Sequence, residues 1–306
     1  MSIIIKKIFL ICILLVLICI SINIGYTDTT VLLIEKIPRV VSILLVGSGL
    51  SVAGLIMQQI VRNKFASPST VGTMEFSCFG IMIGMILFQS TSIFGKISMS
   101  FLFAVFGTLL FLKILDYVKF TDSVFVPLIG IVLGKIVESV TTFFAFHFDI
   151  DHSLMMYTTG GFSNILQGRY EILYLQIPII ALAYYYSYHF TILGFGKTFT
   201  KNLGIDYNKY KYTGLVLISL IVSSSILTVG TIPYIGLVVP NIISILYGDN
   251  IKSNLFLTAY IGIVIVLVCD IISRLIAYPF EIPISTTMGV LGSAIFLYLL
   301  FKEFKE

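Results

Sequence analysis

Ten apolar runs, separated by short polar stretches, constrain the fold of this chain more than any other feature of its sequence. Most are close in length to the about 20 residues with which an α-helix crosses the hydrocarbon core of a bilayer. They lie at about 8–24, 38–61, 71–90, 97–115, 124–146, 172–193, 212–231, 235–247, 255–275 and 284–301. Charged residues make up only 11% of the chain, against about a quarter in soluble proteins, so lipid must cover part of the surface. We therefore predict an all-α, polytopic membrane protein of about ten transmembrane helices, with residues 1–306 forming a single membrane-spanning domain.

The first and the eighth runs depart from the pattern of an ordinary spanning helix. The first, at 8–24, follows Lys6 and Lys7 and so resembles the hydrophobic region of a signal peptide. It lacks a small-x-small cleavage site before Tyr26, and we interpret it as a retained helix with its N-terminus in the cytoplasm. The eighth, at 235–247, is too short for a perpendicular span, which predicts a partial helix packed inside the protein.

The distribution of basic residues predicts the orientation of the chain in the membrane. If the runs alternate from a cytoplasmic start, thirteen basic residues fall inside: Lys6, Lys7, Arg62, Lys64, Lys113, Lys119, Lys197, Lys201, Lys209, Lys211, Lys252, Lys302 and Lys305. Five fall outside: Lys36, Arg39, Lys96, Arg169 and Arg274. The positive-inside rule then places both termini in the cytoplasm and the chain in the cell membrane. Two connections are long, an outer one at about 147–171, expected to be a solvated loop, and an inner one at about 194–211.

Four ionisable residues lie within the apolar runs, where a charge at the centre of a bilayer costs roughly 2.5–3.5 kcal/mol. Lys135 and Glu138 are three positions apart and can pair on one helix face, as can Asp270 and Arg274, which are four apart. A translocation path and a structural pair are both open for Lys135 and Glu138, whereas a structural role is favoured for Asp270. Glu75 lies close to the start of its run and is expected near the membrane interface.

Other classes of function find little support in the sequence. Residues 196–198 read Gly-Lys-Thr, but Thr191 replaces the glycine that a P-loop has five positions earlier, so ATP would be bound by another chain. His147, His152 and His189 are not spaced as metal ligands. No pattern indicates an enzyme active site or a cofactor, and no basic stripe indicates nucleic-acid binding.

Four segments, in the same order, are similar to the FecCD-type permeases, the ten-helix importers of ferric siderophores, haem and vitamin B12. Residues 37–72 contain a Pro-Arg start, a Gly-rich run and an Asn-x-x-Ala-x-Pro turn. Residues 193–211 resemble the cytoplasmic coupling loop of the family. Residues 230–240 are close to its G-x-I-x-F-x-G-L-x-x-P pattern, and residues 269–293 to its D-x-x-x-R…E-x-P…G-x-x-G ending. Each match is weak alone, but the four segments are spread in the right order across about 37–302.

Three positions depart from the usual pattern of the family. Lys64 follows Asn63 where proline is usual, Asn241 follows Pro240 where histidine is common, and Ser244 stands where arginine is usual. These substitutions resemble the subgroup associated with catecholate siderophores.

The resemblance implies a permease bundle like that of the vitamin B12 importer and a function in ATP-driven import of an iron(III)-siderophore complex. Haem and vitamin B12 stay open as cargoes. Besides membrane lipid, the implied partners are ATPase subunits, an extracellular substrate-binding lipoprotein, and a second permease that is either another copy or a sister chain.

The resemblance also suggests site residues. Docking of the binding protein is expected at Arg39 and Arg274. Coupling to the ATPase is expected in short helices of the inner loop, at Gly196, Lys197, Lys201 and Gly204. A translocation path along the second and fifth spans is expected to include Met57, Gln58, Lys135 and Glu138.

Two rival classes account for the composition. In an ion-coupled secondary transporter, Glu75, Lys135, Glu138 and Asp270 would form an ion relay. A membrane-embedded enzyme is the other class. Neither explains why the four segments occur in one order.

Overall fold

The computed structural model describes residues 3–25, 28–88, 92–118 and 125–303. Lys119 and Lys305, which we counted as cytoplasmic, lie outside the described residues, as does Tyr26.

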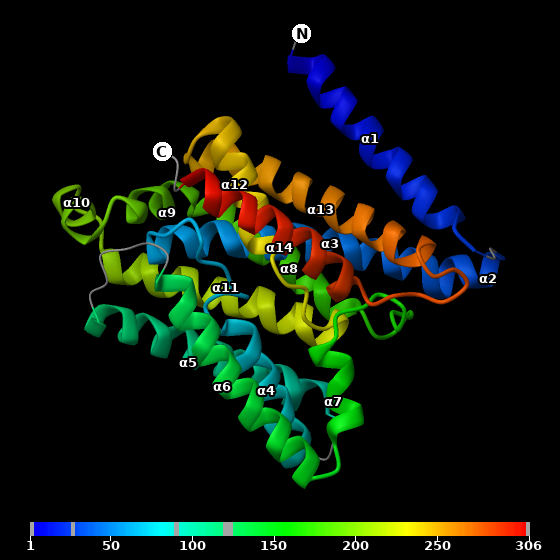
Figure 1. Cartoon of the computed structure of the whole chain (residues 1–306). Helices are drawn as coiled ribbons and strands as arrows, with labels where there is room; N and C mark the ends of the chain where they lie inside the picture. Colours follow the sequence, from blue (N-terminus) through cyan, green and yellow to red (C-terminus); the bar gives the residue numbers. More distant parts are fainter. Residues whose placement is uncertain (1–2, 26–27, 89–91, 119–124, 304–306) are drawn as a thin grey trace.

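Helices make up most of the described chain (Figure 1). They are α1 (Ile3–Asn23), α2 (Thr29–Val31), the π-helical turn η1 (Leu32–Lys36), α3 (Ile37–Val61), α4 (Thr73–Leu87), α5 (Ile93–Val118), α6 (Phe125–His147), α7 (Asp151–Thr158), the 3₁₀ turn η2 (Glu171–Leu175), α8 (Gln176–Tyr185), α9 (Ser187–Gly194), α10 (Lys197–Asn202), α11 (Tyr207–Val229), α12 (Ile235–Tyr247), α13 (Ile251–Leu275) and α14 (Ile284–Glu303). Within the described residues, five helical stretches are long and apolar enough to cross a membrane, and five shorter apolar helices accompany them. The all-α prediction is confirmed.

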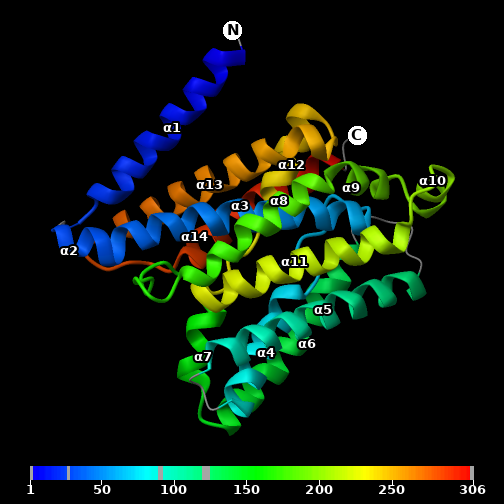
Figure 2. The ribbon, with the colours of Figure 1, turned by 180° about the vertical axis from the view of Figure 1, so that it is seen from behind.

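The helix α3 forms the centre of the bundle, because small residues let its neighbours approach closely. A side chain at Gly47 would touch the backbone of Gly262 on α13, and one at Gly54 would overlap the carbonyl group of Gly236 on α12. Seen from behind, α3 lies among α8, α11 and α13 (Figure 2). It continues the helical stretch that starts at Thr29, and the π-helical turn stands just before Pro38, whose ring nitrogen cannot donate to the helix ladder.

The helices α4 and α12 are short and begin inside the bundle. The bounds of α12 are those that we predicted for the partial helix, and it starts after an irregular segment that ends at Tyr234. Of the run at 71–90, which we read as a full span, the part that the structure describes ends at 88, and Thr73–Leu87 within it is helical. A turn around Gly72, whose φ of 87° suits glycine, precedes α4.

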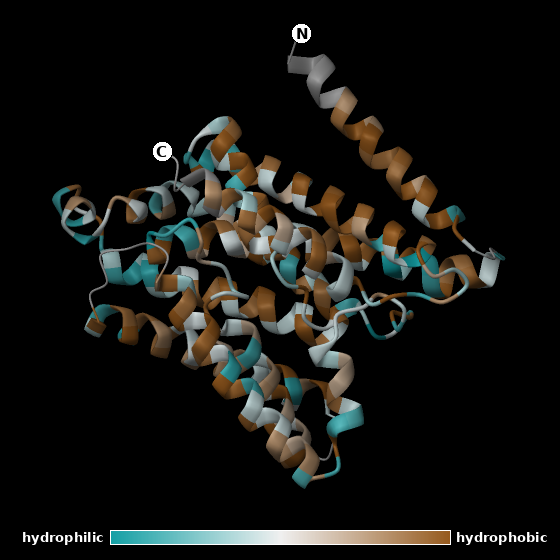
Figure 3. Ribbon diagram, viewed as in Figure 1, coloured by the Kyte–Doolittle hydropathy of each residue, from teal (hydrophilic) through white to brown (hydrophobic). Residues whose placement is uncertain are grey.

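The two ends of the bundle carry different polar segments. The helix α10 lies at the same end as the C-terminal end of α14, whereas α7 lies toward the other end (Figures 1 and 2). We expected a solvated loop at 147–171, but this stretch contains α7. The flanks of the long helices are largely hydrophobic, and hydrophilic residues gather in the connections and near the helix ends (Figure 3). This distribution suits a bundle that is surrounded by lipid between its two ends.

Candidate functional site

A cavity of about 400 Å³ opens between α4, α6, α7 and the segment before α12, and we call it the α6 cavity. Three of the four ionisable residues that we singled out line it: Glu75, Lys135 and Glu138. The fourth, Asp270, is buried in α13, away from the cavity wall. The structure therefore divides the intramembrane charges into two separate sites.

Lys135 and Glu138 form an ion pair on α6. The Nζ of Lys135 lies 2.6 Å from Oε2 of Glu138, as the three-residue spacing predicted. Their side chains are 70% and 48% exposed, so the pair is open to the cavity. The same helix presents large apolar side chains such as Phe143 and Ile136 on its outer surface. A charged pair beside an apolar face fits a helix that borders a cavity on one side.

Glu75 stands in the first turn of α4, and its carboxylate packs against α6. A side chain at Gly134 would lie 3.1 Å from Cδ of Glu75, so this glycine makes room for the carboxylate. Oε2 of Glu75 is buried and has no hydrogen-bond partner among the described residues. The turn at Gly72 starts α4 among buried residues and carries the carboxylate toward α6. The expected place of Glu75 near the membrane interface stays a prediction.

Met57 and Gln58 lie in the protein core rather than on the wall of the α6 cavity. Met57 is fully buried and Gln58 is 6% exposed. The Nε2 of Gln58 donates to the carbonyl oxygen of Lys64 at 2.7 Å, and Nδ2 of Asn241 donates to the same oxygen at 2.8 Å. Gln58 and Asn241 thus hold the turn after α3 against α12. The assignment of Met57 and Gln58 to a translocation path stays a prediction.

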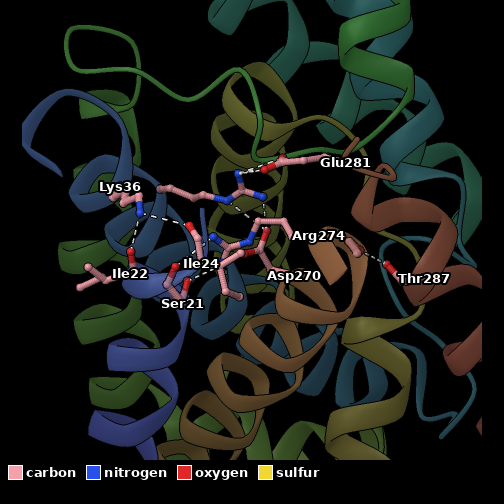
Figure 4. Close-up of polar contacts among 10 residues, drawn as sticks. Ser21, Ile22, Ile24, Lys36, Asp270, Arg274, Glu281 and Thr287 are labelled. Carbon is pink, nitrogen blue, oxygen red and sulfur yellow. Dashed lines mark hydrogen bonds and ion pairs between the residues drawn. The ribbon is translucent and has the colours of Figure 1, made fainter. Parts of the chain in front are cut away.

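Four charged side chains, Arg39, Asp270, Arg274 and Glu281, form the arginine cluster (Figure 4). Asp270 binds Arg39 through Oδ1 at 2.7 Å and Arg274 through Oδ2 at 2.9 Å. The Nη1 of Arg39 also donates to both oxygens of Glu281 at 2.9 Å. The predicted pair of Asp270 and Arg274 is therefore present within α13, and the pair of Arg39 and Asp270 joins α3 to α13. Both arginines are buried, and their guanidinium groups are committed to partners within the chain.

The arginine cluster also anchors the C-terminal end of α1. Arg274 donates to the carbonyl oxygen of Ser21 at 2.9 Å and to its hydroxyl at 2.6 Å. The Nζ of Lys36 donates to the carbonyl oxygens of Ile22 at 2.6 Å and Ile24 at 3.1 Å (Figure 4). The last carbonyl groups of a helix lack partners within the helix and carry partial negative charge, so cations bind there favourably.

A second cavity, of about 700 Å³, lies between α5, α7 and the segment that follows α7. Lys96 and Arg169 line it, together with Glu281 of the arginine cluster. The Nζ of the buried Lys96 lies 3.5 Å from the hydroxyl of Tyr157, and Arg169 is exposed. The helix α7 separates the two cavities, since Leu154 and other residues of α7 line the α6 cavity. In the described part of the chain, no group of three or more His, Cys, Asp or Glu is placed to hold a metal ion.

The inner loop forms a short helix, as we predicted, and projects from the bundle (Figure 1). Lys197 and Lys201 are exposed on α10. Gly196 and Gly204 flank the helix with φ angles of 98° and 72°, which glycine adopts without strain. Thr200 ties α10 to the preceding turn, because its hydroxyl donates to the carbonyl oxygen of Gly196 at 2.8 Å.

Two exposed aromatic residues accompany these lysines and were not among the predicted site residues. Phe195 is 66% exposed and Phe199 is 47% exposed, and their ring centroids lie 5.2 Å apart. The signal was available in the sequence, since aromatic residues in a lysine-rich loop are unusual for a purely solvated segment. The projecting helix therefore offers a mixed apolar and basic surface.

Comparison with known proteins identifies the family of the chain. The model of the FecCD transport family matches residues 7–302. The chain belongs to the FecCD transport family. The petrobactin import system permease protein YclN of Bacillus subtilis is 46% identical over 276 residues, which cover 90% of this chain and 87% of that protein. The ferric-anguibactin transport system permease protein FatD of Vibrio anguillarum is 36% identical over 271 residues, which cover 89% of this chain and 86% of that protein.

The fold agrees with this membership. A solved structure of a metal-chelate type ABC transporter in an inward-facing conformation superimposes with a TM-score of 0.79, covering 96% of this chain and 98% of that one at 23% identity. The resemblance that the four segments suggested is thus confirmed, together with the helical membrane fold. The family is one of membrane-embedded transport proteins, and this sets the enzyme class aside.

Proposed function

We propose that the chain is the permease subunit of an ABC importer that takes up an iron(III)-siderophore complex. The observation that carries this proposal is the identity with two permeases that are named for petrobactin and ferric anguibactin, over about nine-tenths of the chain. Both names refer to iron chelators, which favours an iron chelate over haem or vitamin B12. The catecholate subgroup, inferred from Lys64, Asn241 and Ser244, is part of the same proposal.

The importer resides in the cytoplasmic membrane with both termini in the cytoplasm. Thirteen basic residues against five support this orientation. The position of α10, at the same end of the bundle as the C-terminal end of α14, agrees with it.

ATP is hydrolysed by a separate ATPase that contacts α10. Lys197 and Lys201 would meet acidic groups of the ATPase, while the exposed rings of Phe195 and Phe199 would enter an apolar part of its surface. Gly196 and Gly204 provide the turns that let so short a helix project from the bundle. Movement of the ATPase would thereby reach α9 and α11, which flank the loop.

Cargo passes beside the α6 cavity, where Lys135 and Glu138 are open to it. A second permease, another copy or a sister chain, covers the exposed apolar face of α6 and closes the path on that side. This face includes Phe143, which is 67% exposed, and the burial of such side chains favours association.

The binding lipoprotein docks at the end of the bundle that carries the arginine cluster. Because Arg39 and Arg274 are buried, the binding protein would reach Arg39 by competing with a partner that Arg39 already has. Glu281, whose side chain is 34% exposed, is the accessible partner of Arg39, and a carboxylate of the binding protein would compete with it. Arg274 would act through Asp270, which it shares with Arg39.

The test is uptake of ⁵⁵Fe-labelled siderophore complexes in a strain that lacks this chain, with and without a plasmid copy. We expect ATP-dependent uptake of at least one ferric siderophore to return with the copy. Restored uptake of haem or vitamin B12 without any ferric siderophore would refute the proposed cargo. Uptake that persists after the partner ATPase is deleted would refute ATP-driven import.

A further inference from the structure

The wall of the α6 cavity offers many hydrogen-bond acceptors. The hydroxyl of Thr141 donates to the carbonyl oxygen of Val137 at 2.7 Å, and that of Thr142 donates to the carbonyl oxygen of Glu138 at 2.9 Å. The hydroxyl of Thr231 likewise donates to the backbone of α7 at 2.6 Å. Each of these hydroxyls already donates its hydrogen to a backbone carbonyl oxygen. Toward a molecule in the cavity, the hydroxyl oxygen can therefore act only as a hydrogen-bond acceptor.

The charged residues of the cavity add to this excess of acceptors. The ammonium group of Lys135 is bound to Glu138 at 2.6 Å, which leaves these two charges balanced. Glu75 then supplies a further carboxylate, so the formal charge of the three residues is −1 when all are ionised. Its Oε2 is buried and has no hydrogen-bond partner among the described residues. Leaving a buried acceptor unpaired is costly, and for a carboxylate the natural partner is a cationic donor.

We propose that Glu75 is a specificity-determining residue of the cargo path, and that it favours ferric chelates that carry a protonated amine. An ammonium group in the cavity would pair with the carboxylate of Glu75 and neutralise its charge. The threonine oxygens of the cavity wall would accept the remaining N–H groups. Gly134 is part of this site, because a larger residue there would press on the carboxylate of Glu75. The inference rests on the proposed function, since it names a chemical feature of the same cargo.

The test compares one ferric chelate that has a free amine with the same chelate after N-acetylation, which removes the positive charge. The full importer, with its ATPase and binding protein, is reconstituted in liposomes, and uptake is measured with the binding protein saturated by each chelate. The readout is the ratio of the two uptake rates, so differences in the amount of active importer cancel. We expect the wild-type ratio to favour the amine.

The variant is Glu75→Gln, which keeps the size of the side chain and removes its charge. We expect the ratio to fall about tenfold, the factor that corresponds to about 1.4 kcal/mol, while uptake of the acetylated chelate stays unchanged. Glu75→Asp, which keeps the charge, is expected to retain part of the preference. Glu35→Gln is the matched control, because Glu35 is exposed in η1, outside the cavity, and should leave the ratio unaltered.

The outcomes separate the two proposals. A wild-type importer that transports both chelates equally, or a Glu75→Gln variant that keeps the wild-type ratio, would overturn the role of Glu75 and leave the import function standing. An equal fall in the uptake of both chelates in Glu75→Gln would also overturn it, because it would indicate a structural role. A wild-type importer that accumulates neither chelate would overturn the proposed function and this inference together.

Discussion

Asp270 is a central residue of the arginine cluster, because two arginines share its buried carboxylate. Its oxygens bind Arg39 and Arg274 separately, and Glu281 supplies the second negative charge of the arginine cluster. The four formal charges therefore cancel, which is the condition under which buried charges are tolerated. Arg39 and Asp270 are 231 positions apart, so the spacing of residues along one helix can reveal Arg274 as a partner but not Arg39.

Replacement of Asp270 by Asn would leave two buried guanidinium groups beside each other without their shared carboxylate. We expect Asp270→Asn to lower the free energy of unfolding by about 3–5 kcal/mol, the usual cost of breaking a buried ion pair. Denaturation of the purified protein in detergent would measure this loss.

The control is Lys64→Gln, which removes an exposed pair with Asp249 at 3.8 Å. Exposed pairs contribute about 0–1 kcal/mol, so this variant should unfold almost as the wild type does. If the two variants lost the same free energy of unfolding, burial of the arginine cluster would not be the reason why the cluster stabilises the protein.

At the scale of elements, α10 illustrates how a segment of six residues can project from the bundle as a helix. Isolated helices of this length are unstable in water, so the turns on each side must hold it. Thr200 binds the carbonyl oxygen of Gly196, and Asp206 caps the start of α11 by accepting from the amides of Asn208 and Lys209. Nothing lies within 4 Å of a Cβ placed at Gly204, so the position opens onto free space in this chain.

Gly204→Trp should therefore leave the fold of the chain intact and obstruct the partner ATPase. We expect ATP-dependent uptake in reconstituted liposomes to fall on the order of tenfold, which corresponds to roughly 1.4 kcal/mol of lost contact.

Gly204→Ala is the control for backbone strain. It places a Cβ at the same positive φ, at about 1–2 kcal/mol, but adds little bulk. If uptake fell equally in the Ala and Trp variants, the loss of uptake would come from backbone strain rather than from contact with the ATPase. Normal uptake in Gly204→Trp would refute the proposed contact.

For the molecule as a whole, the orientation in the membrane connects all of the proposed sites. If α10 faces the cytoplasm, the arginine cluster and the larger cavity face the exterior, because the N-terminal end of α3, the C-terminal end of α13 and α7 lie toward the opposite end of the bundle (Figure 1). Under the proposed orientation, which rests on the asymmetry of basic residues, the ATPase would contact one end of the bundle and the binding protein the other.

Labelling with a membrane-impermeant maleimide in intact cells tests this orientation. In a background in which Cys12, Cys19, Cys78 and Cys269 are replaced by serine, Ser163→Cys and Thr198→Cys each place one thiol at an exposed position. We expect Ser163→Cys to react in intact cells, whereas Thr198→Cys should react only after permeabilisation. The reverse pattern would contradict the proposed positions of the ATPase and the binding protein.

The sequence by itself determined where most helices of this protein lie. A bilayer requires a certain helix length, and the apolar runs have about that length. It predicted the bounds of the short helix α12 to the residue. It also predicted the pair of Lys135 and Glu138, because this pair depends only on the pitch of one helix. It did not show that α4 begins within the bundle, that α7 stands where a loop was expected, or that Met57 and Gln58 face the core.

The tertiary structure decided which charges meet. Arg39 joins Asp270 and Glu281, and the carboxylate of Glu75 is enclosed against Gly134, because helices distant in the sequence cross at their small residues. Of this chain, 58% of the residues are hydrophobic, and they face lipid as well as the core, so hydrophobic periodicity cannot establish how each helix is rotated about its axis. The rotation of each helix is set by the packing of small residues against neighbouring backbones, and this packing forms only when the bundle assembles.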